Sequence, residues 1–279
     1  MAWRGLHLSR PARLSLRDGQ IIVAQEDGEV ALPLEDVAWI VIDTPQATLT
    51  AALLSACAGG GVAVIVVDAA HTPSGVLLPF HRHHRQGEAA RWQLNATEPT
   101  RKRLWRTLVQ SKIANQADAL DMVGAEGAKP LREMIRHVRS GDPDNVEARA
   151  ARAYWGRLWP DFRRDDDADR RNALLNYGYA VIRSAVARAL VATGLLPAIG
   201  LHHDSATNAF NLADDLVEPF RPFIDVLAWR TAGAGAKSGG PLTLDDRRAM
   251  AGCLLGPAEA AGETATLLVA TERAASSLA

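Results

Sequence analysis

The first eighty residues of the chain alternate apolar and polar positions with the period of two that is typical of β-strands. Asp18-Gly19 and Asp27-Gly28 separate three such runs, as the turns of consecutive β-hairpins do. Val37 to Ile42 and Val62 to Val67 are almost wholly apolar and rich in β-branched side chains, which predicts two buried strands. Between them, residues 49–58 predict one short helix that stops at three consecutive glycines. No Gly-Lys-Ser/Thr follows these glycines, so a helix-to-strand turn is favoured over a phosphate loop.

Beyond Pro79 the apolar positions recur three and four residues apart, which is the period of amphipathic helices. Seven helices and no strand are expected there. They lie near residues 101–123, 131–139, 145–158, 172–193, 208–230, 244–255 and 257–276. This segregation predicts an α+β fold with a small β-rich, sandwich-like N-terminal domain over residues 1–85 and a larger all-α C-terminal domain over residues 86–279.

Composition changes this picture little. Apolar residues make up 48% of the chain, enough for a buried core, and the net charge of −1 gives no indication of a nucleic-acid partner. Cys57 and Cys253 lack the number and spacing of a disulfide framework or a zinc site. The N-terminus does not resemble a signal peptide, and no segment approaches the roughly 20 apolar residues of a membrane span. We therefore expect a cytoplasmic protein without membrane association.

The charge distribution is more informative, because basic residues outnumber acidic ones between His81 and Lys112. Trp92 and Trp105 are interleaved with them. Such a band could attract DNA phosphates, whereas the alternative is a solvated helix face, which the residues alone favour. The candidates for phosphate contact are Arg82, Arg85, Arg101, Lys102 and Arg103.

Residues 200–225 carry two adjacent histidines followed by an amphipathic stretch with several carboxylates on one side. A histidine beside such a face would give the mixed nitrogen and oxygen shell that manganese accepts. Pro219 predicts a kink or restart of the helix at Glu218, which would aim this side chain into a site. The alternative is that Glu218 only caps a helix beginning at Pro219.

Glu147 is a second candidate carboxylate, at the start of an otherwise basic helix. Asp144-Asn-Val-Glu147 has the spacing of a capping box, so the residues alone favour a structural role over a catalytic one. For His202 and His203 a structural role is likewise the ordinary expectation, and at most one of two adjacent histidines should bind a metal. A serine hydrolase is disfavoured, because no Gly-x-Ser-x-Gly elbow is present.

Three segments together resemble the CRISPR-associated Cas1 integrase family, and in particular its members from type II systems. Gly200 to Ser205 followed by Asn208 to Pro222 is the most specific of them. The Asn-x-Glu-x-x-Ala-Ala-Arg-x-Tyr-Trp pattern of residues 145–155 and the Asn-Ala-Leu-Leu-Asn-Tyr-Gly-Tyr pattern of residues 172–179 are similar to further parts of the family. The resemblance extends over the whole chain.

This resemblance implies that Glu147, His203 and Glu218 are the catalytic residues and bind Mg²⁺ or Mn²⁺. It implies an endonuclease and integrase that inserts short double-stranded DNA fragments into a CRISPR array by transesterification from a 3′-hydroxyl. It further implies a homodimer formed through the N-terminal domain, DNA held by the helical domain, a heterohexamer with the small partner Cas2, and contacts with other type II Cas proteins. Two alternatives are a catalytically silent DNA-binding scaffold and a plain nuclease for branched DNA.

Overall fold

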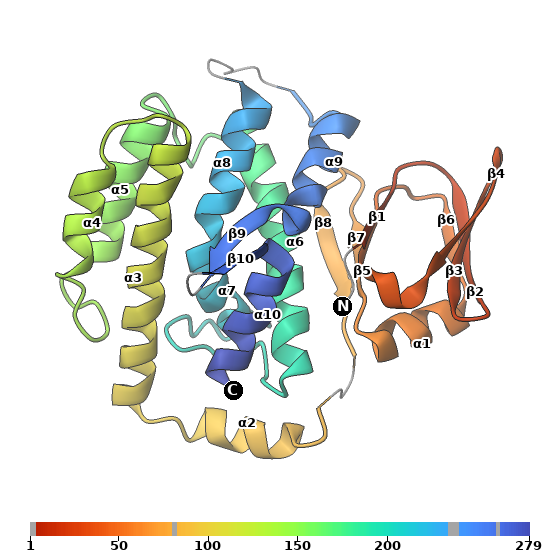
Figure 1. The fold of residues 1–279 in the computed structure, drawn as a ribbon, viewed down its shortest axis with the longest axis horizontal. Helices are drawn as coiled ribbons and strands as arrows, with labels where there is room; N and C mark the ends of the chain where they lie inside the picture. Colours follow the sequence, from red (N-terminus) through yellow and green to blue (C-terminus); the bar gives the residue numbers. More distant parts are fainter. Residues whose placement is uncertain (1–3, 80–82, 234–239, 261–262) are drawn as a thin grey trace. The chain divides into compact units, whose positions relative to one another are not determined.

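The structure is a computed structural model that describes residues 4–79, 83–233, 240–260 and 263–279. The chain forms two compact units, of which the first joins residues 1–86 to residues 180–195 and 254–279. The second unit joins residues 87–179 to residues 196–253. Strands dominate the N-terminal part of the chain and helices the rest (Figure 1), which confirms the predicted α+β class. The assignment of dimerisation to residues 1–85 and of catalysis to residues 86–279 stays a prediction.

Two four-stranded sheets form the N-terminal part of the first unit, and both mix parallel with antiparallel pairs. In the first sheet the order is β1 (Arg4–Leu8), β5 (Val37–Ile42), β7 (Ala63–Val67) and β8 (Pro73–Leu77). In the second it is β4 (Gly28–Pro33), β3 (Gln20–Gln25), β2 (Ala12–Arg17) and β6 (Ala47–Leu49).

Both sheets share one apolar core with helix α1 (Ala51–Gly60). Leu14 from one sheet, Ile40 from the other and Leu53 from α1 are all fully buried in it. A core between two sheets agrees with the sandwich-like prediction, and α1 is the short helix expected near residues 49–58, whereas the parallel strand pairs were not expected. Cys57 lies in the same core, where burial raises the pKa of its thiol to about 11, in keeping with an inert cysteine.

The predicted turns form where the sequence places them. Asp18 and Gly19 both have positive φ angles, 50° and 72°, as a two-residue hairpin between β2 and β3 requires. The Thr50 hydroxyl accepts a hydrogen bond from the Leu53 backbone N–H and begins α1. Gly61, with a φ of 73°, ends this helix in the left-handed region and leads into β7. The helix-to-strand reading of the three glycines is therefore confirmed.

Helix α3 (Glu98–Met122) is the longest element of the chain and packs against α4, α5 and α8 in the second unit (Figure 1). The other helices of the chain up to residue 251 are α2 (Gln86–Leu94), α4 (Ala128–Ile135), α5 (Val146–Leu158), α6 (Arg170–Ala192), α7 (Asn211–Val217), α8 (Arg221–Ala232) and α9 (Leu244–Ala251). Short 3-10 helices are η1 (Leu34–Asp36), η2 (Glu218–Phe220) and η3 (Gly252–Leu255). None of the described helices is both long and apolar enough to cross a membrane.

The predicted break at Glu218 is confirmed. Helix α7 ends at Val217, η2 carries Glu218, and α8 starts at Arg221. Pro219 has no backbone N–H to continue the helical pattern, and Asn115 of α3 donates its side-chain amide to the Pro219 carbonyl at 2.7 Å. The N-cap positions of η2 and α8 belong to Val217 and Phe220, so the alternative that Glu218 only caps a helix is wrong.

The prediction of an all-α C-terminal part is wrong between residues 257 and 266. Strand β9 (Pro257–Ala260) pairs with β10 (Glu263–Thr266) as an antiparallel hairpin, and helix α10 (Leu267–Leu278) begins only afterwards. The Thr266 hydroxyl accepts from the Val269 N–H and sets this start. Alanines fit either period, and the threonines of β10 favour a strand, so spacing alone was ambiguous here.

Candidate active site

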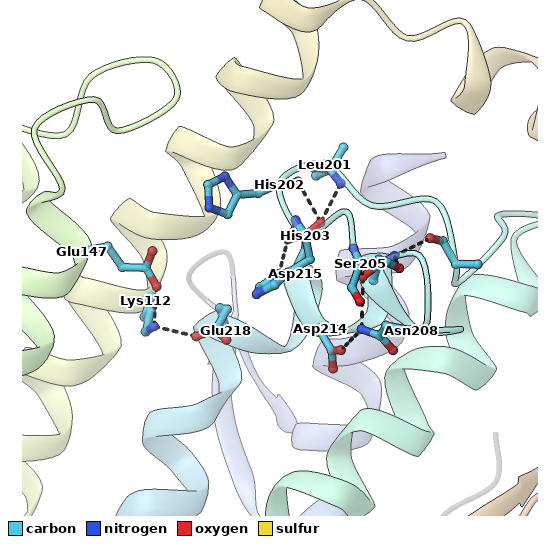
Figure 2. A network of polar contacts seen from close by, with 12 residues as sticks. Lys112, Glu147, Leu201, His202, His203, Ser205, Asn208, Asp214, Asp215 and Glu218 are labelled. Atoms are coloured by element: carbon cyan, nitrogen blue, oxygen red, sulfur yellow. Dashed lines mark hydrogen bonds and ion pairs between the residues drawn. The ribbon is translucent and has the colours of Figure 1, made fainter. Parts of the chain in front are cut away.

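Two glutamates from different helices converge on one lysine in the second unit. Lys112 of α3 places its ammonium 2.6 Å from Oε1 of Glu147, on α5, and 2.5 Å from Oε2 of Glu218, in η2. Figure 2 shows this ammonium between the two carboxylates, with His203 and Asp215 on the Glu218 side. Residues separated by more than a hundred positions in the sequence are thus brought to one place by three helices.

Glu147 reaches this place without taking part in capping its own helix. Asp142, not Asp144, accepts the backbone N–H groups of Val146 and Glu147, at 3.0 and 2.9 Å. Asp144 instead forms a bidentate ion pair with Arg139. The expected capping box is therefore wrong, and the Glu147 carboxylate is directed to Lys112 rather than to the helix start.

Glu218 is held by two cations. Its Oε1 accepts from Nε of Arg221 at 2.8 Å, and its Oε2 faces Lys112. Burial alone would raise the pKa of Glu218, but the charges of Lys112 and Arg221 outweigh burial and lower it. Burial likewise opposes the charge of Lys112, while Glu218 and Glu147 more than offset it, so the pKa of Lys112 is raised. Glu218 and Lys112 are therefore both ionised at neutral pH.

His203 lies on a loop that the carboxylate of Asp215, on α7, holds through hydrogen bonds. One carboxylate oxygen of Asp215 accepts from the N–H groups of Leu201 and His202, and the other from the N–H and Nδ1 of His203. The hydrogen bond to Asp215 raises the pKa of His203 despite its partial burial. Because Nδ1 contacts Asp215 at 2.7 Å, Nε2 is the ring nitrogen left for a ligand.

The loop is tight enough to require glycine at its start. A Cβ at Gly200 would lie 2.1 Å from the His203 carbonyl oxygen and 2.9 Å from the Asp215 carboxylate. Asn211, one helical turn before Asp215, donates to the Ala198 and Ser205 carbonyls at 3.1 and 2.9 Å. Two polar residues of one short helix thus fix the conformation that presents His203.

The two adjacent histidines have different surroundings. The His202 ring stacks on Trp105 of α3, with centroids 4.2 Å apart and planes 5° from parallel. Trp105 itself is buried, and the exposed His202 covers one face of its indole. His203 meets the same indole edge-on and is the one bonded to Asp215. The imidazole of His203 is thus bonded to a carboxylate, whereas the imidazole of His202 stacks on an indole.

The chemistry of Glu147, Glu218 and His203 fits a divalent cation. Two carboxylate oxygens and one oriented imidazole are a donor set for Mn²⁺ and, less often, Mg²⁺, and Asp215 supplies the orienting contact that metal-bound histidines usually have. Within the described residues, no three histidine, cysteine or acidic side chains are gathered closely enough to hold an ion as they stand. The Lys112 ammonium fills the position between the two glutamates instead.

The expectation that the carboxylates of residues 200–225 lie on one side is wrong for Asp225. It is fully buried and accepts hydrogen bonds from the hydroxyls of Tyr154 and Tyr179. Burial raises the pKa of Asp225 to about 7, although both tyrosines act against this shift. Arg221 lies over the Tyr179 ring at 4.5 Å, which connects this buried cluster to Glu218.

Asp225→Asn should change the pH dependence of stability. The pKa of Asp225 is higher in the folded than in the unfolded protein, so the folded state binds the proton more tightly. The free energy of unfolding of the wild type should therefore fall between about pH 4 and pH 7, by about 2–4 kcal/mol, and level off above. Asparagine cannot ionise and should lack this component. Denaturant unfolding of both proteins at pH 5 and pH 8 measures the difference, and an identical pH dependence would contradict the assignment.

The family model described as CRISPR associated protein Cas1 matches residues 6–239, which include Lys112, Glu147, His203 and Glu218. The chain belongs to the Cas1 family. The resemblance read from the three sequence segments is thereby confirmed.

Individual relatives agree with membership of the Cas1 family. A CRISPR-associated endonuclease Cas1 from Neisseria meningitidis serogroup C (strain 8013) is 44% identical over 227 residues, which are 81% of this chain and 75% of the relative. A casposase bound to integration product has a TM-score of 0.78 at 19% identity, covering 99% of this chain and 89% of that one. A Cas6-RT-Cas1–Cas2 complex gives a TM-score of 0.70 at 17% identity, over 99% of this chain and 34% of that one. Identities this low show a shared fold alone.

The expected DNA contacts of this Cas1 family member remain predictions. Arg101, Lys102 and Arg103 are exposed at the first turns of α3, where Lys102 pairs with Glu98 at 2.6 Å. Arg85 is exposed in the first unit, and Arg82 lies outside the described residues. Arg171, in contrast, is buried in ion pairs with Asp161 and Asp169, so its role is structural.

The sequence does not reveal three residues that position this site. Lys112 lies at the end of the basic band, Asp215 is one of several acids on a helix face, and Asp142 precedes the helix of Glu147. The signal for Lys112 was its position two helical turns after Trp105, on the same face of α3. This position indicates a role in the site only when it is known that α5 and η2 pack against the same face of α3.

Proposed function

We propose that this Cas1 family member is a metal-dependent DNA endonuclease and integrase of CRISPR adaptation, with Glu147, His203 and Glu218 as metal ligands. The observation that carries the proposal is the convergence of Glu147 and Glu218 on one cation position beside the oriented His203. The names of the relatives support it, since one is an endonuclease and another was solved with an integration product.

The reaction needs no external energy source. The 3′-hydroxyl oxygen of a fragment attacks a phosphorus atom in the array, a new P–O bond forms, and the bond to the array's own 3′-oxygen breaks. The number of phosphodiester bonds is unchanged, so no nucleotide-binding loop is required. With water in place of the hydroxyl, the same site would cleave DNA. One set of residues would therefore account for both integration and DNA cleavage.

The contacts of each residue indicate its role in the proposed reaction. Glu147, Glu218 and Nε2 of His203 would hold the ion, Asp215 keeps the imidazole turned toward it, and Arg221 fixes the second oxygen of Glu218. When bound, the divalent cation supplies polarisation of the phosphoryl oxygen and a lower pKa for the attacking hydroxyl. Arg221 also adds positive charge beside the site, which favours a phosphate approaching it.

The assembly is proposed on the same basis. A structural relative occurs in a complex with Cas2, and we propose Cas2, double-stranded DNA and a second copy of this chain as partners, in a heterohexamer. The phosphate contacts would come from Arg85, Arg101, Lys102 and Arg103. Cytoplasmic location, type II character and contacts with other Cas proteins belong to the same proposal.

Strand transfer tests this function directly. A short duplex is incubated with the chain, its Cas2 partner and a supercoiled plasmid bearing a leader and repeat, with Mn²⁺ or with chelator. We expect joining only with the metal and only when the duplex has a free 3′-hydroxyl; a duplex with 3′-deoxy ends is the matched control. Nicking without joining would favour the plain nuclease, and DNA binding without either would favour the scaffold.

A further inference from the structure

The Lys112 ammonium occupies the position that a shared cation would take between Glu147 and Glu218. Its side chain is only 13% exposed, and it contacts one oxygen of each glutamate at 2.6 and 2.5 Å. Glu218 is 9% exposed and uses its other oxygen for Arg221. The two carboxylates must therefore lie close together, and a cation between them offsets their mutual repulsion.

A divalent ion and the ammonium compete for the same oxygens. An ion bound by Glu147 and by Oε2 of Glu218 needs the oxygens that now face the Lys112 ammonium, because Oε1 of Glu218 already contacts Arg221. Keeping both cations would place a lysine and a divalent charge in direct contact, which Coulomb repulsion opposes. A lysine has a long flexible stem and can move its head group toward solvent, which the planar Arg221 fork does less readily.

We propose that Lys112 is a positioning residue that holds Glu147 and Glu218 together in the metal-free protein and is displaced from them when a divalent cation binds. This inference rests on the proposed function, because it takes the two glutamates as the ligands. It gives Lys112 two opposite effects. Lys112 stabilises the metal-free site, and it weakens apparent metal affinity because each binding event must first break two ion pairs.

The chain provides a matched control on the same helix. Lys102 also pairs with a glutamate at 2.6 Å, but this pair with Glu98 is exposed and far from the site in the sequence of α3. Both Lys102→Met and Lys112→Met remove one ammonium group from α3. The first variant breaks one ion pair and the second breaks two. A general effect of losing a lysine from α3 would appear in both variants.

Calorimetry with Mn²⁺ alone, at fixed pH and without DNA, tests the proposal on the full chain. We expect Lys112→Met to bind Mn²⁺ about tenfold more tightly or better, since the competitor is gone, while its metal-free Tm falls and Mn²⁺ restores it. Lys112→Arg should keep the metal-free Tm near that of the wild type. Lys102→Met should change neither quantity.

Unchanged or weaker Mn²⁺ binding by a folded Lys112→Met would overturn the proposal, because a purely structural lysine would lower the Tm only. Should that variant fail to fold, Lys112→Gln is measured with the same two expectations. A wild type that binds Mn²⁺ as expected but joins no DNA would contradict the proposed function alone, and a wild type that joins DNA while Lys112→Met gains no affinity would contradict this inference alone.

Discussion

Glu218→Gln is expected to abolish DNA joining, with a loss of about 10²-fold or more. Glutamine keeps the size of the side chain and one acceptor oxygen, but it removes the negative charge that Lys112 and Arg221 face. Arg221 then lacks its carboxylate partner, Lys112 keeps only Glu147, and a metal ion would lose a carboxylate ligand. The rate of strand transfer with Mn²⁺ measures the effect.

The same substitution should also lower the free energy of unfolding by about 3 kcal/mol, because it breaks a buried ion pair from one side. Glu98→Gln is the control, since Glu98 is an exposed carboxylate paired with a lysine of the same helix region. It should change the stability by less than about 1 kcal/mol. Joining within a few fold of the wild-type rate by Glu218→Gln would contradict the assigned role of this residue.

Asp215→Asn is expected to lose both joining and stability. Asp215 is fully buried and its two oxygens accept from three backbone N–H groups and from Nδ1 of His203. An asparagine has one carbonyl oxygen that can accept, but its amide NH₂ can only donate. Some of the N–H groups that now donate to Asp215 would therefore lose their acceptor and face another donor. The cost should be about 3 kcal/mol of unfolding free energy.

Joining should fall by about 10- to 100-fold in the fraction of Asp215→Asn that stays folded, because the imidazole is no longer oriented. The neighbouring Asp214, which accepts from Asn208 at 2.7 Å and is partly exposed, gives the control Asp214→Asn. Chemical denaturation and strand transfer on all three proteins separate the two effects. Equal behaviour of the Asp214 and Asp215 variants would show that Asp215 does not act through His203.

The sequence was sufficient for those parts of the fold that depend on local physics. Hairpin turns at Asp-Gly pairs, the capped start of α1 and the break at Pro219 follow from backbone constraints that act within a few residues. The final segment was misread because alanines and threonines fit both periods, and its pairing as a hairpin is a tertiary matter. The polar helix α2 was missed because it has no apolar stripe.

The candidate site was found only in part for a similar reason. Family patterns selected Glu147, His203 and Glu218, whereas physics at the level of the sequence favoured capping for Glu147. Which carboxylate faces a lysine, a histidine loop or a tyrosine pair depends on how α3, α5, α6 and α7 pack. Spacing along one helix places Asp215, Glu218 and Asp225 near one face, but it does not say that each has a different partner.

The most direct test of the account compares His203→Ala with His202→Ala in strand transfer with Mn²⁺, alongside DNA binding. The two residues are adjacent, yet His203 is oriented by Asp215 and His202 stacks on Trp105. The account predicts that His203→Ala loses joining while it still binds DNA, and that His202→Ala joins within a few fold of the wild type. Joining that survives His203→Ala, or that is lost equally in both variants, would contradict the claim that His203 belongs to a metal-dependent DNA-joining site.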